Sequence, residues 1–406
     1  MDNRFVYMDY NATTPLRDEV KARMIEDFDI FANASSMHEA GRRARDRVEK
    51  ARAQVAALIG AADPRSILFT SGGSESNNTV FNTMYDLGRG PGGRRKIVTT
   101  AIEHPCVMNA ARRLSDEGFP VVFLGVDGRG RIDLNELESE LDPARSTGGP
   151  ALLVSVMAAN NEIGTVQDMK AVSALAKAAG AYFHTDAVQA AGKMAVDVSS
   201  WGVDYLTLSC HKIYGPKGVG ALYVRKGVPA EPLIRGGHQE LGIRAGTYNN
   251  QGILGFGLAA ELAARDLDSF AERLRSLRER LKEGISASVP DIRINGHPTE
   301  VLPNTLNVSF PGAEGEAILL SLDLEGIEVS TGSACASGSL EPSHVLMATG
   351  VGPEMAHGSI RFSMGRGSRE EDVDYVVEKL APIIKRLRRM STIAPAVAVA
   401  AQACRD

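Results

Sequence analysis

Two stretches decide the fold: Tyr182-Phe183-His184-Thr185-Asp186-Ala187-Val188-Gln189 and Tyr205-Leu206-Thr207-Leu208-Ser209-Cys210-His211-Lys212. In each, a run typical of a buried strand leads directly into polar residues and a turn. Similar runs recur at 67–69, 97–99, 121–124, 152–156 and 221–224, with helix-length segments such as 105–117 and 169–179 between them. This alternation predicts a largely parallel α/β sheet. Because parallel strands end at one edge of a sheet, we expect Asp186 and Lys212 to face one crevice.

A second region follows with a different order of elements. Apolar residues spaced as on one helix face predict a long amphipathic helix from Leu267 through Leu281. Weaker strands follow near 304–310, 327–329 and 359–363, and then a helix from about 368 to 389. We therefore predict a large domain over 15–262, a smaller α+β domain formed by 1–14 and 263–390, and a disordered tail over 391–406.

The composition narrows the class of protein. The 406 residues include 45 Lys and Arg against 50 Asp and Glu, a net charge of −5, so nucleic acid is not an expected partner. The four cysteines, Cys106, Cys210, Cys335 and Cys404, form no C-x-x-C pair, which argues against a disulfide framework or a structural zinc site. Residues 1–10 hold charges and no long apolar run. We expect a cytoplasmic protein without a membrane partner.

The polar residues after the two strands suggest a specific chemistry. A lysine at a strand end beside glycine turns can form a Schiff base when burial or charge lowers its pKa, although a surface lysine is the ordinary alternative for Lys212. A buried Asp186 needs a cationic partner such as a pyridinium nitrogen, and its alternative role is a helix N-cap. Gln189 could reach a ring hydroxyl, and its alternative is an exposed helical glutamine.

A glycine-rich stretch supplies a third feature. It reads Thr70-Ser71-Gly72-Gly73-Ser74-Glu75-Ser76-Asn77-Asn78 and leads from the strand at 67–69 into a helix. Amides and hydroxyls at a helix N-terminus can bind a phosphate. The stretch contains neither a Walker lysine nor G-x-G-x-x-G, so a single phosphate fits better than a nucleotide. Phosphate cradle, aspartate and lysine are together the parts that hold pyridoxal 5'-phosphate.

Seven motifs, in this order along the chain, resemble those of the cysteine desulfurases. They are Asp9-Tyr10-Asn11-Ala12-Thr13-Thr14-Pro15, Glu103-His104-Pro105, Asn160-Asn161-Glu162-Ile163-Gly164, His184-Thr185-Asp186-Ala187-Val188-Gln189, His211-Lys212, Arg235-Gly236-Gly237-His238-Gln239-Glu240 and Gly332-Ser333-Ala334-Cys335. The resemblance covers roughly 5–390. It implies the fold-type-I, aspartate aminotransferase-like architecture of pyridoxal phosphate enzymes, with a mostly parallel seven-stranded sheet and a smaller α+β domain. It also implies a homodimer in which both subunits contribute to each site.

The resemblance gives the matching residues their cofactor roles. Lys212 would be the Schiff-base lysine, Asp186 the partner of the pyridine nitrogen and Gln189 the donor to the ring hydroxyl. His104 would stack on the ring and move protons, and the alternative for it is a turn residue before Pro105. Further cofactor positions implied in the same way are Gly73, Ser74, Asn161, Ser209, His211 and, reaching the partner subunit's phosphate, Thr247.

Two further residues match substrate-binding positions. Arg361 lies on a predicted strand, and a planar guanidinium can bind an amino-acid carboxylate through paired hydrogen bonds. A solvated strand arginine is the alternative. The resemblance places Asn161 near the substrate as well as the ring hydroxyl, and a helix cap is the alternative for it.

Cys335 is the most informative cysteine. Its surroundings, 330–339, are small and polar, so we expect an exposed, mobile loop and not the small core residue that a free cysteine usually is. An accessible thiol on such a loop can attack sulfur and carry it away. The resemblance also implies that Cys335 is a transient ligand of an iron–sulfur cluster. Cys106, Cys210 and Cys404 are interpreted as turn, strand and tail residues.

Together these features predict a pyridoxal phosphate-dependent cysteine desulfurase. It would convert L-cysteine to L-alanine and pass a persulfide from Cys335 to an iron–sulfur scaffold protein. Residues 338–344 and 356–358 resemble the nitrogen-fixation (NifS-like) type, which predicts a role in nitrogenase maturation, whereas 213–216 resemble the housekeeping type. Departures from the family pattern are Ala34, where proline is common, and Ser74, where threonine is common. The alternatives are a selenocysteine lyase, an aminotransferase and a catalytically idle dimeric platform for protein binding.

Overall fold

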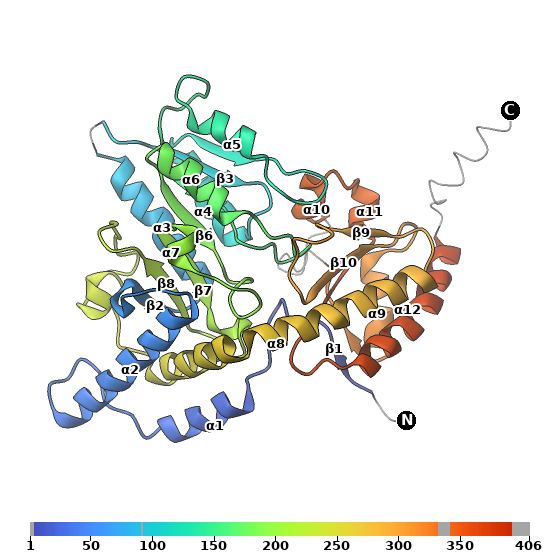
Figure 1. Ribbon diagram of the computed structural model, residues 1–406, viewed down its shortest axis with the longest axis horizontal. Helices are drawn as coiled ribbons and strands as arrows, with labels where there is room; N and C mark the ends of the chain where they lie inside the picture. Colours follow the sequence, from blue (N-terminus) through green and yellow to red (C-terminus); the bar gives the residue numbers. More distant parts are fainter. Residues whose placement is uncertain (1–3, 91, 332–341, 392–406) are drawn as a thin grey trace.

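A computed structural model of the chain describes residues 4–90, 92–331 and 342–391 (Figure 1). The predictions for Cys335, including its role as a cluster ligand, lie outside these residues. So do those for Cys404 and for the tail beyond Ser391.

A seven-stranded sheet forms the centre of the larger part of the molecule (Figure 1). In chain order its strands are β2 (Ile67–Thr70), β3 (Lys96–Thr100), β4 (Val121–Leu124), β5 (Ala151–Ser155), β6 (Tyr182–Asp186), β7 (Tyr205–Ser209) and β8 (Gly220–Val224). They lie in the order β2-β8-β7-β6-β5-β3-β4. Strand β8 runs antiparallel to β2 and β7, and the other neighbouring pairs are parallel. The predicted seven-stranded, mostly parallel sheet is confirmed.

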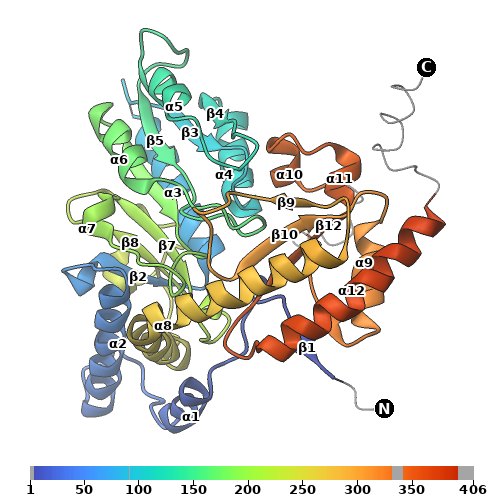
Figure 2. The same cartoon turned by 45° about the vertical axis from the view of Figure 1, so that its right-hand side comes forward.

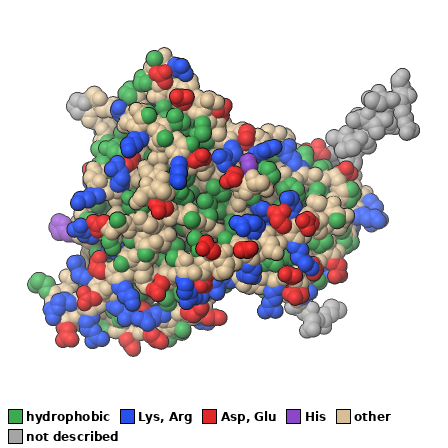
Figure 3. All heavy atoms as spheres, viewed as in Figure 1, with side chains coloured by type: hydrophobic (Ala, Val, Ile, Leu, Met, Phe, Trp, Pro, Cys, Tyr) green, Lys and Arg blue, Asp and Glu red, His purple; other side chains and the backbone are tan. Residues whose placement is uncertain are grey.

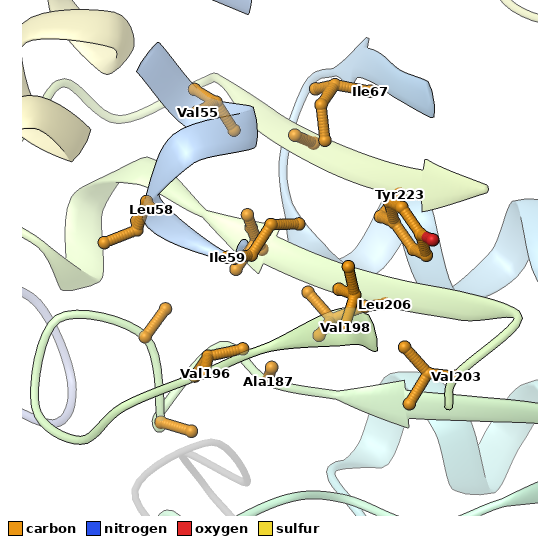
Figure 4. Close-up of a cluster of buried hydrophobic side chains, with 14 of the residues drawn as sticks. Val55, Leu58, Ile59, Ile67, Ala187, Val196, Val198, Val203, Leu206 and Tyr223 are labelled. Atoms are coloured by element: carbon orange, nitrogen blue, oxygen red, sulfur yellow. The ribbon is translucent and has the colours of Figure 1, made fainter. Parts of the chain in front are cut away.

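Helices pack on both faces of this sheet because its central strands are apolar on both sides. Along β7, Leu206 belongs to the apolar cluster under α2 and α8, whereas Tyr205 belongs to the cluster under α3 and α4. Figure 4 shows part of the first cluster, where Ile59, just after α2, lies near Leu206. The helices of this part are α1 (Asp18–Asp27), α2 (Glu39–Leu58), α3 (Gly73–Gly88), α4 (Pro105–Asp116), α5 (Leu134–Leu141), α6 (Met169–Ala178) and α7 (Val198–Trp201).

Helix α8 (Asn250–Ser288) links the two parts of the molecule (Figure 2). Phe256 lies in the apolar cluster of the large sheet, and Leu274 and Leu281 lie in that of the smaller part. The predicted helix from Leu267 is therefore only the second half of α8. The first half gave no amphipathic signal because small residues pack it closely on α2: a Cβ on Gly257 would lie 2.6 Å from the Cα of Ala51.

The smaller part packs around a separate apolar cluster. Its antiparallel sheet has the order β12-β10-β9, and β1 pairs with β11 in parallel. Its strands are β1 (Val6–Tyr7), β9 (Arg293–Asn295), β10 (Thr305–Ser309), β11 (Ile327–Glu328) and β12 (Ser359–Ser363). Its helices, besides the end of α8, are α9 (Gly315–Asp323), α10 (His344–Ala348), α11 (Pro353–His357) and α12 (Glu370–Met390). The predicted division at 262/263 falls inside α8, and the domain bounds remain a proposal.

The charge distribution on the surface and the apolar character of the helices are relevant to the partners that the protein can have. On the face shown in Figure 3, basic and acidic side chains are interspersed. Within the described ranges, no helix has the length and apolar character needed to cross a membrane.

Candidate active site

The predicted site residues meet in a cavity of about 300 Å³ at the carboxyl ends of β6 and β7. This is where ligands of open α/β sheets bind. The predicted residues that line the cavity are Gly73, Ser74, His104, Asn161, Asp186, Gln189, Ser209, His211, Lys212 and Arg361. The lining also includes residues that were not predicted to belong to the site: Asn11, Ala12, Asn77, Cys106, Met157, Ala159 and Val188.

Asp186 ends β6 and is 7% exposed. Asn77 donates a hydrogen bond from Nδ2 to its Oδ2 at 2.8 Å, and the backbone N–H of Val188 donates to its Oδ1 at 3.0 Å. The second contact closes a turn, and because turns and not a helix follow β6, the alternative of a helix N-cap for Asp186 is wrong. Both oxygens are held in place, so the carboxylate has a fixed orientation in the cavity. The buried Oδ1 of Asn77 has no partner among the described residues.

Lys212 enters the same cavity from the short helix η2 (Cys210–Lys212), which follows β7 directly. Its Nζ donates to the carbonyl oxygens of Asn11 at 2.5 Å and Ala12 at 2.6 Å. Thr14 ties the two segments together, because its N–H and Oγ1 both donate to the carbonyl of His211. The N-terminal segment thus forms one wall of the site.

His104 caps the N-terminus of α4. Its Nδ1 accepts a hydrogen bond from the N–H of Cys106 at 3.2 Å, so it is a helix cap and not the turn residue considered as an alternative. Burial lowers the pKa of His104, with Lys212 and His344 acting in the same direction and Asp186 opposing them. A neutral ring that accepts at Nδ1 carries its proton on Nε2, so this histidine can act as a donor at neutral pH.

The N-terminus of α3 forms the predicted phosphate side of the cavity. A Cβ on Gly73 would lie 3.0 Å from Cγ2 of Val188, so glycine keeps this cradle open. Ser74 and Ser209 add hydroxyl groups, and Ser209 is 7% exposed. Burial and nearby lysines lower the pKa of His211 to about 4, so its ring is neutral at pH 7. These groups can surround a phosphate with hydrogen-bond donors.

Arg361 lies on β12 and is 3% exposed, so the alternative of a solvated strand arginine is wrong. Its Nη2 donates to Asp9 Oδ1 at 2.7 Å, and its Nη1 donates to the carbonyl of Asn161 at 3.1 Å. The buried Nε has no partner among the described residues. Each Nη carries a second N–H and Arg361 lines the cavity, so the guanidinium can donate to an incoming carboxylate.

The positions of Thr247, Cys106 and Cys210 can also be compared with their predicted roles. Thr247 is exposed and does not line the cavity, so its predicted contact with the partner subunit's phosphate stays a prediction. Cys106, interpreted as a turn residue, lies instead in the first turn of α4 and lines the cavity, and burial raises the pKa of its thiol to about 12. Cys210, interpreted as a strand residue, begins η2 instead and is buried. No cluster of metal-binding side chains occurs in the part of the chain that the structure describes.

Known proteins match this chain over most of its length. The family model described as aminotransferase class-V matches residues 6–376. A cysteine desulfurase IscS of Dictyoglomus turgidum is 47% identical over 389 residues, which are 96% of this chain and 96% of that protein. The chain belongs to the class-V aminotransferases and, among them, to the cysteine desulfurases.

Two further class-V relatives support this assignment. Cysteine desulfurase 1 of Trichormus variabilis is 48% identical over 387 residues, 95% of this chain and 94% of that protein. A solved structure described as a NifS-like protein has a TM-score of 0.87 and 39% identity, and the match covers 94% of this chain and 100% of that one. The fold-type-I architecture implied by the motifs is thereby confirmed.

Cysteine desulfurases of this family use pyridoxal 5'-phosphate, and the residues of the cavity fit that cofactor. The oriented carboxylate of Asp186 can pair with a pyridinium nitrogen, and the cradle that Gly73 keeps open can take a phosphate. Lys212 is the amine that can hold the aldehyde carbon. The chain is therefore a pyridoxal phosphate-dependent enzyme.

Proposed function

We propose that this enzyme converts L-cysteine to L-alanine and leaves the sulfur as a persulfide on Cys335. One observation carries the proposal: Arg361, buried and with Nε unpartnered, shares a cavity with Lys212 and Asp186. An amino acid held there by its carboxylate would lie beside the lysine amine. The relatives that are named cysteine desulfurases support L-cysteine as that amino acid.

The chain's own residues can bind the substrate and move its protons. Arg361 and Asn161 hold the carboxylate end, and Lys212 takes the proton from the α carbon. Bound pyridoxal phosphate supplies the electron sink for the carbanion that results. His104 lines the same cavity, its neutral ring can donate a hydrogen bond from Nε2, and it is the group that we propose takes part in moving the substrate's protons.

In the sulfur step, the thiolate of Cys335 attacks the substrate sulfur. The new S–S bond forms as the C–S bond breaks, and the electron pair of the C–S bond stays with the carbon that becomes the alanine methyl group after protonation. Residues on both sides of 332–341 support this role. Ser330 pairs with Arg361 through two backbone hydrogen bonds, and Ser343 donates to the buried Glu162 at 2.5 Å.

We further propose that Cys335 passes its sulfur to an iron–sulfur scaffold protein and is a transient ligand of the growing cluster. The enzyme would act as a homodimer in the reducing cytoplasm, where a free thiol persists. Nitrogenase maturation is the proposed use of the sulfur, supported by the nitrogen-fixation character of 338–344 and 356–358. Names of both types, IscS and NifS-like, occur among the relatives.

The test compares the parent protein with Cys335→Ala, each loaded with pyridoxal phosphate and supplied with L-cysteine and a reductant. We expect the parent to release alanine and sulfide in equal amounts and the variant to release neither while it keeps the yellow colour of the bound cofactor. Undiminished release by the variant would refute the persulfide role of Cys335. Faster turnover of L-selenocysteine by both proteins would indicate a selenocysteine lyase instead.

A further inference from the structure

Lys193 is a buried lysine directly behind the cavity. It lies in the turns that follow β6, and it is 4% exposed. Its Nζ donates to the side-chain Oε1 of Gln189 at 2.8 Å and to the backbone carbonyl of the same residue at 3.2 Å. Both of these hydrogen bonds are to one residue, Gln189, and that residue lines the cavity.

The surroundings of Lys193 do not favour a charge. Burial lowers its pKa to about 7, and the charged groups that act on it, Lys212 and Arg361, are both cations. A buried amine among cations is costly, and an apolar side chain of similar size would fill the same space at lower cost. Buried side chains are usually apolar, so a buried lysine at this position indicates a role in the neighbouring site.

The contacts of Gln189 show what that role is. Its Nε2 donates to the carbonyl oxygen of Asn11 at 3.0 Å, while its Oε1 accepts from Lys193. If the amide were turned over, Oε1 would face the carbonyl oxygen of Asn11 and Nε2 would face the Lys193 amine. Acceptor would then meet acceptor at Asn11, and donor would meet donor at the ammonium form of Lys193. The two partners therefore select one orientation, which leaves the second N–H of Nε2 for a ligand.

We propose that Lys193 is a positioning residue that holds the Gln189 amide with its N–H toward the ring hydroxyl of the cofactor. Without Lys193 only the carbonyl of Asn11 selects this orientation, so the amide turns over more readily and can present its oxygen to that hydroxyl. The inference rests on the proposed contact between Gln189 and the ring hydroxyl. The same network reaches Lys212, because the carbonyl of Asn11 accepts from both Gln189 and Lys212.

The test is a double-mutant cycle on cofactor affinity, measured by titrating apoprotein with pyridoxal phosphate and following its visible absorbance. Lys193→Met removes the donor and keeps the length of the side chain. We expect it to weaken cofactor binding about tenfold or more, the effect of losing one hydrogen bond in a buried site. Gln189→Ala should weaken binding to a similar degree, and the double variant should bind no more weakly than Gln189→Ala.

Lys96→Met is the matched control. Lys96 is also buried and donates to Glu140, but it begins β3 at the opposite edge of the sheet and does not line the cavity. Its loss should leave the affinity for pyridoxal phosphate unchanged. If Lys193→Met does not fold, Lys193→Gln is measured in the same cycle, and thermal unfolding of each apoprotein verifies folding.

The outcomes separate this inference from the proposed function. Parent-like affinity in folded Lys193→Met, or effects of Lys193→Met and Gln189→Ala that simply add, would overturn the positioning role. A parent protein that binds pyridoxal phosphate but releases no sulfide from L-cysteine would overturn the proposed function and leave the Lys193 result standing. The absorbance of the bound cofactor gives a further readout: its pH dependence should shift in Lys193→Met and in Gln189→Ala, and stay as in the parent in Lys96→Met.

Discussion

Replacing Arg361 by lysine should weaken substrate binding and leave cofactor binding intact. The guanidinium already bonds Asp9 through Nη2 and the carbonyl of Asn161 through Nη1, and each of these nitrogens has a second N–H for a ligand in the cavity. Lysine would keep a positive charge beside Asp9. A single ammonium cannot, however, present paired donors in one plane to a carboxylate.

The size of the effect follows from the contacts that are lost. A hydrogen bond to a charged group contributes about 1.5 to 3 kcal/mol, which corresponds to a loss of roughly 10- to 150-fold in kcat/KM. The substrate carboxylate is bound before and during the reaction, so the loss should fall mainly on KM. The free energy of unfolding should change little, because the charge opposite Asp9 is retained.

The assay is alanine formation over a range of L-cysteine concentrations, with both proteins loaded with pyridoxal phosphate. Arg293→Lys is the matched control, because Arg293 lies in the same small sheet on β9 and does not line the cavity. An unchanged KM in Arg361→Lys that carries its full complement of cofactor would show that the carboxylate is not held at this residue.

Two further predictions concern the walls of the site. Gly73→Ala would place a Cβ 3.0 Å from Cγ2 of Val188. Overpacking of about 1 to 3 kcal/mol should weaken pyridoxal phosphate binding roughly 5- to 150-fold, measured by titrating apoprotein with the cofactor. Equal affinity in both proteins would show that Gly73 does not line the phosphate site. Burial raises the pKa of Glu162 from 4.5 to about 7, although Ser343 and Arg361 act in the opposite direction. The protonated carboxyl group therefore stabilises the fold fully below about pH 4.5, and this stabilisation is lost as the pH rises through 7. Urea unfolding at pH 5 and at pH 9 measures this loss. The free energy of unfolding should fall less in Glu162→Gln than in the parent, by roughly 1 to 3 kcal/mol. An equal fall in both proteins would count against a buried, neutral Glu162.

Most of the large sheet could be predicted because its strands are buried on both faces. In β5 and β7 every residue is buried, and each strand is a short run rich in apolar and β-branched residues that is bounded by turns. The antiparallel direction of β8 was not predicted from its residues, which would suit a parallel strand equally well. The direction is set by the connection: between Ser209 and Gly220 the chain forms only the short helix η2, and a parallel return needs a crossover of a dozen or more residues.

The site separates into residues that topology brings together and residues that only tertiary contacts reveal. Asp186 and Lys212 follow neighbouring parallel strands, so their meeting could be inferred from the order of elements alone. Asn11 and Asn77 stand in motifs that were noticed for other reasons. Their contacts with Lys212 and Asp186 join segments far apart in the sequence, and no local pattern encodes such pairings.

Lys193 shows why a pattern can mislead at such a site. In Ala190-Ala191-Gly192-Lys193 a lysine after a glycine is typical of an exposed turn. It is buried here, and its amine bonds Gln189, which in turn bonds the carbonyl of Asn11. The cost of that burial is offset only if the oriented amide is used. The position at which the sequence rule fails is therefore also the position at which the structure indicates function.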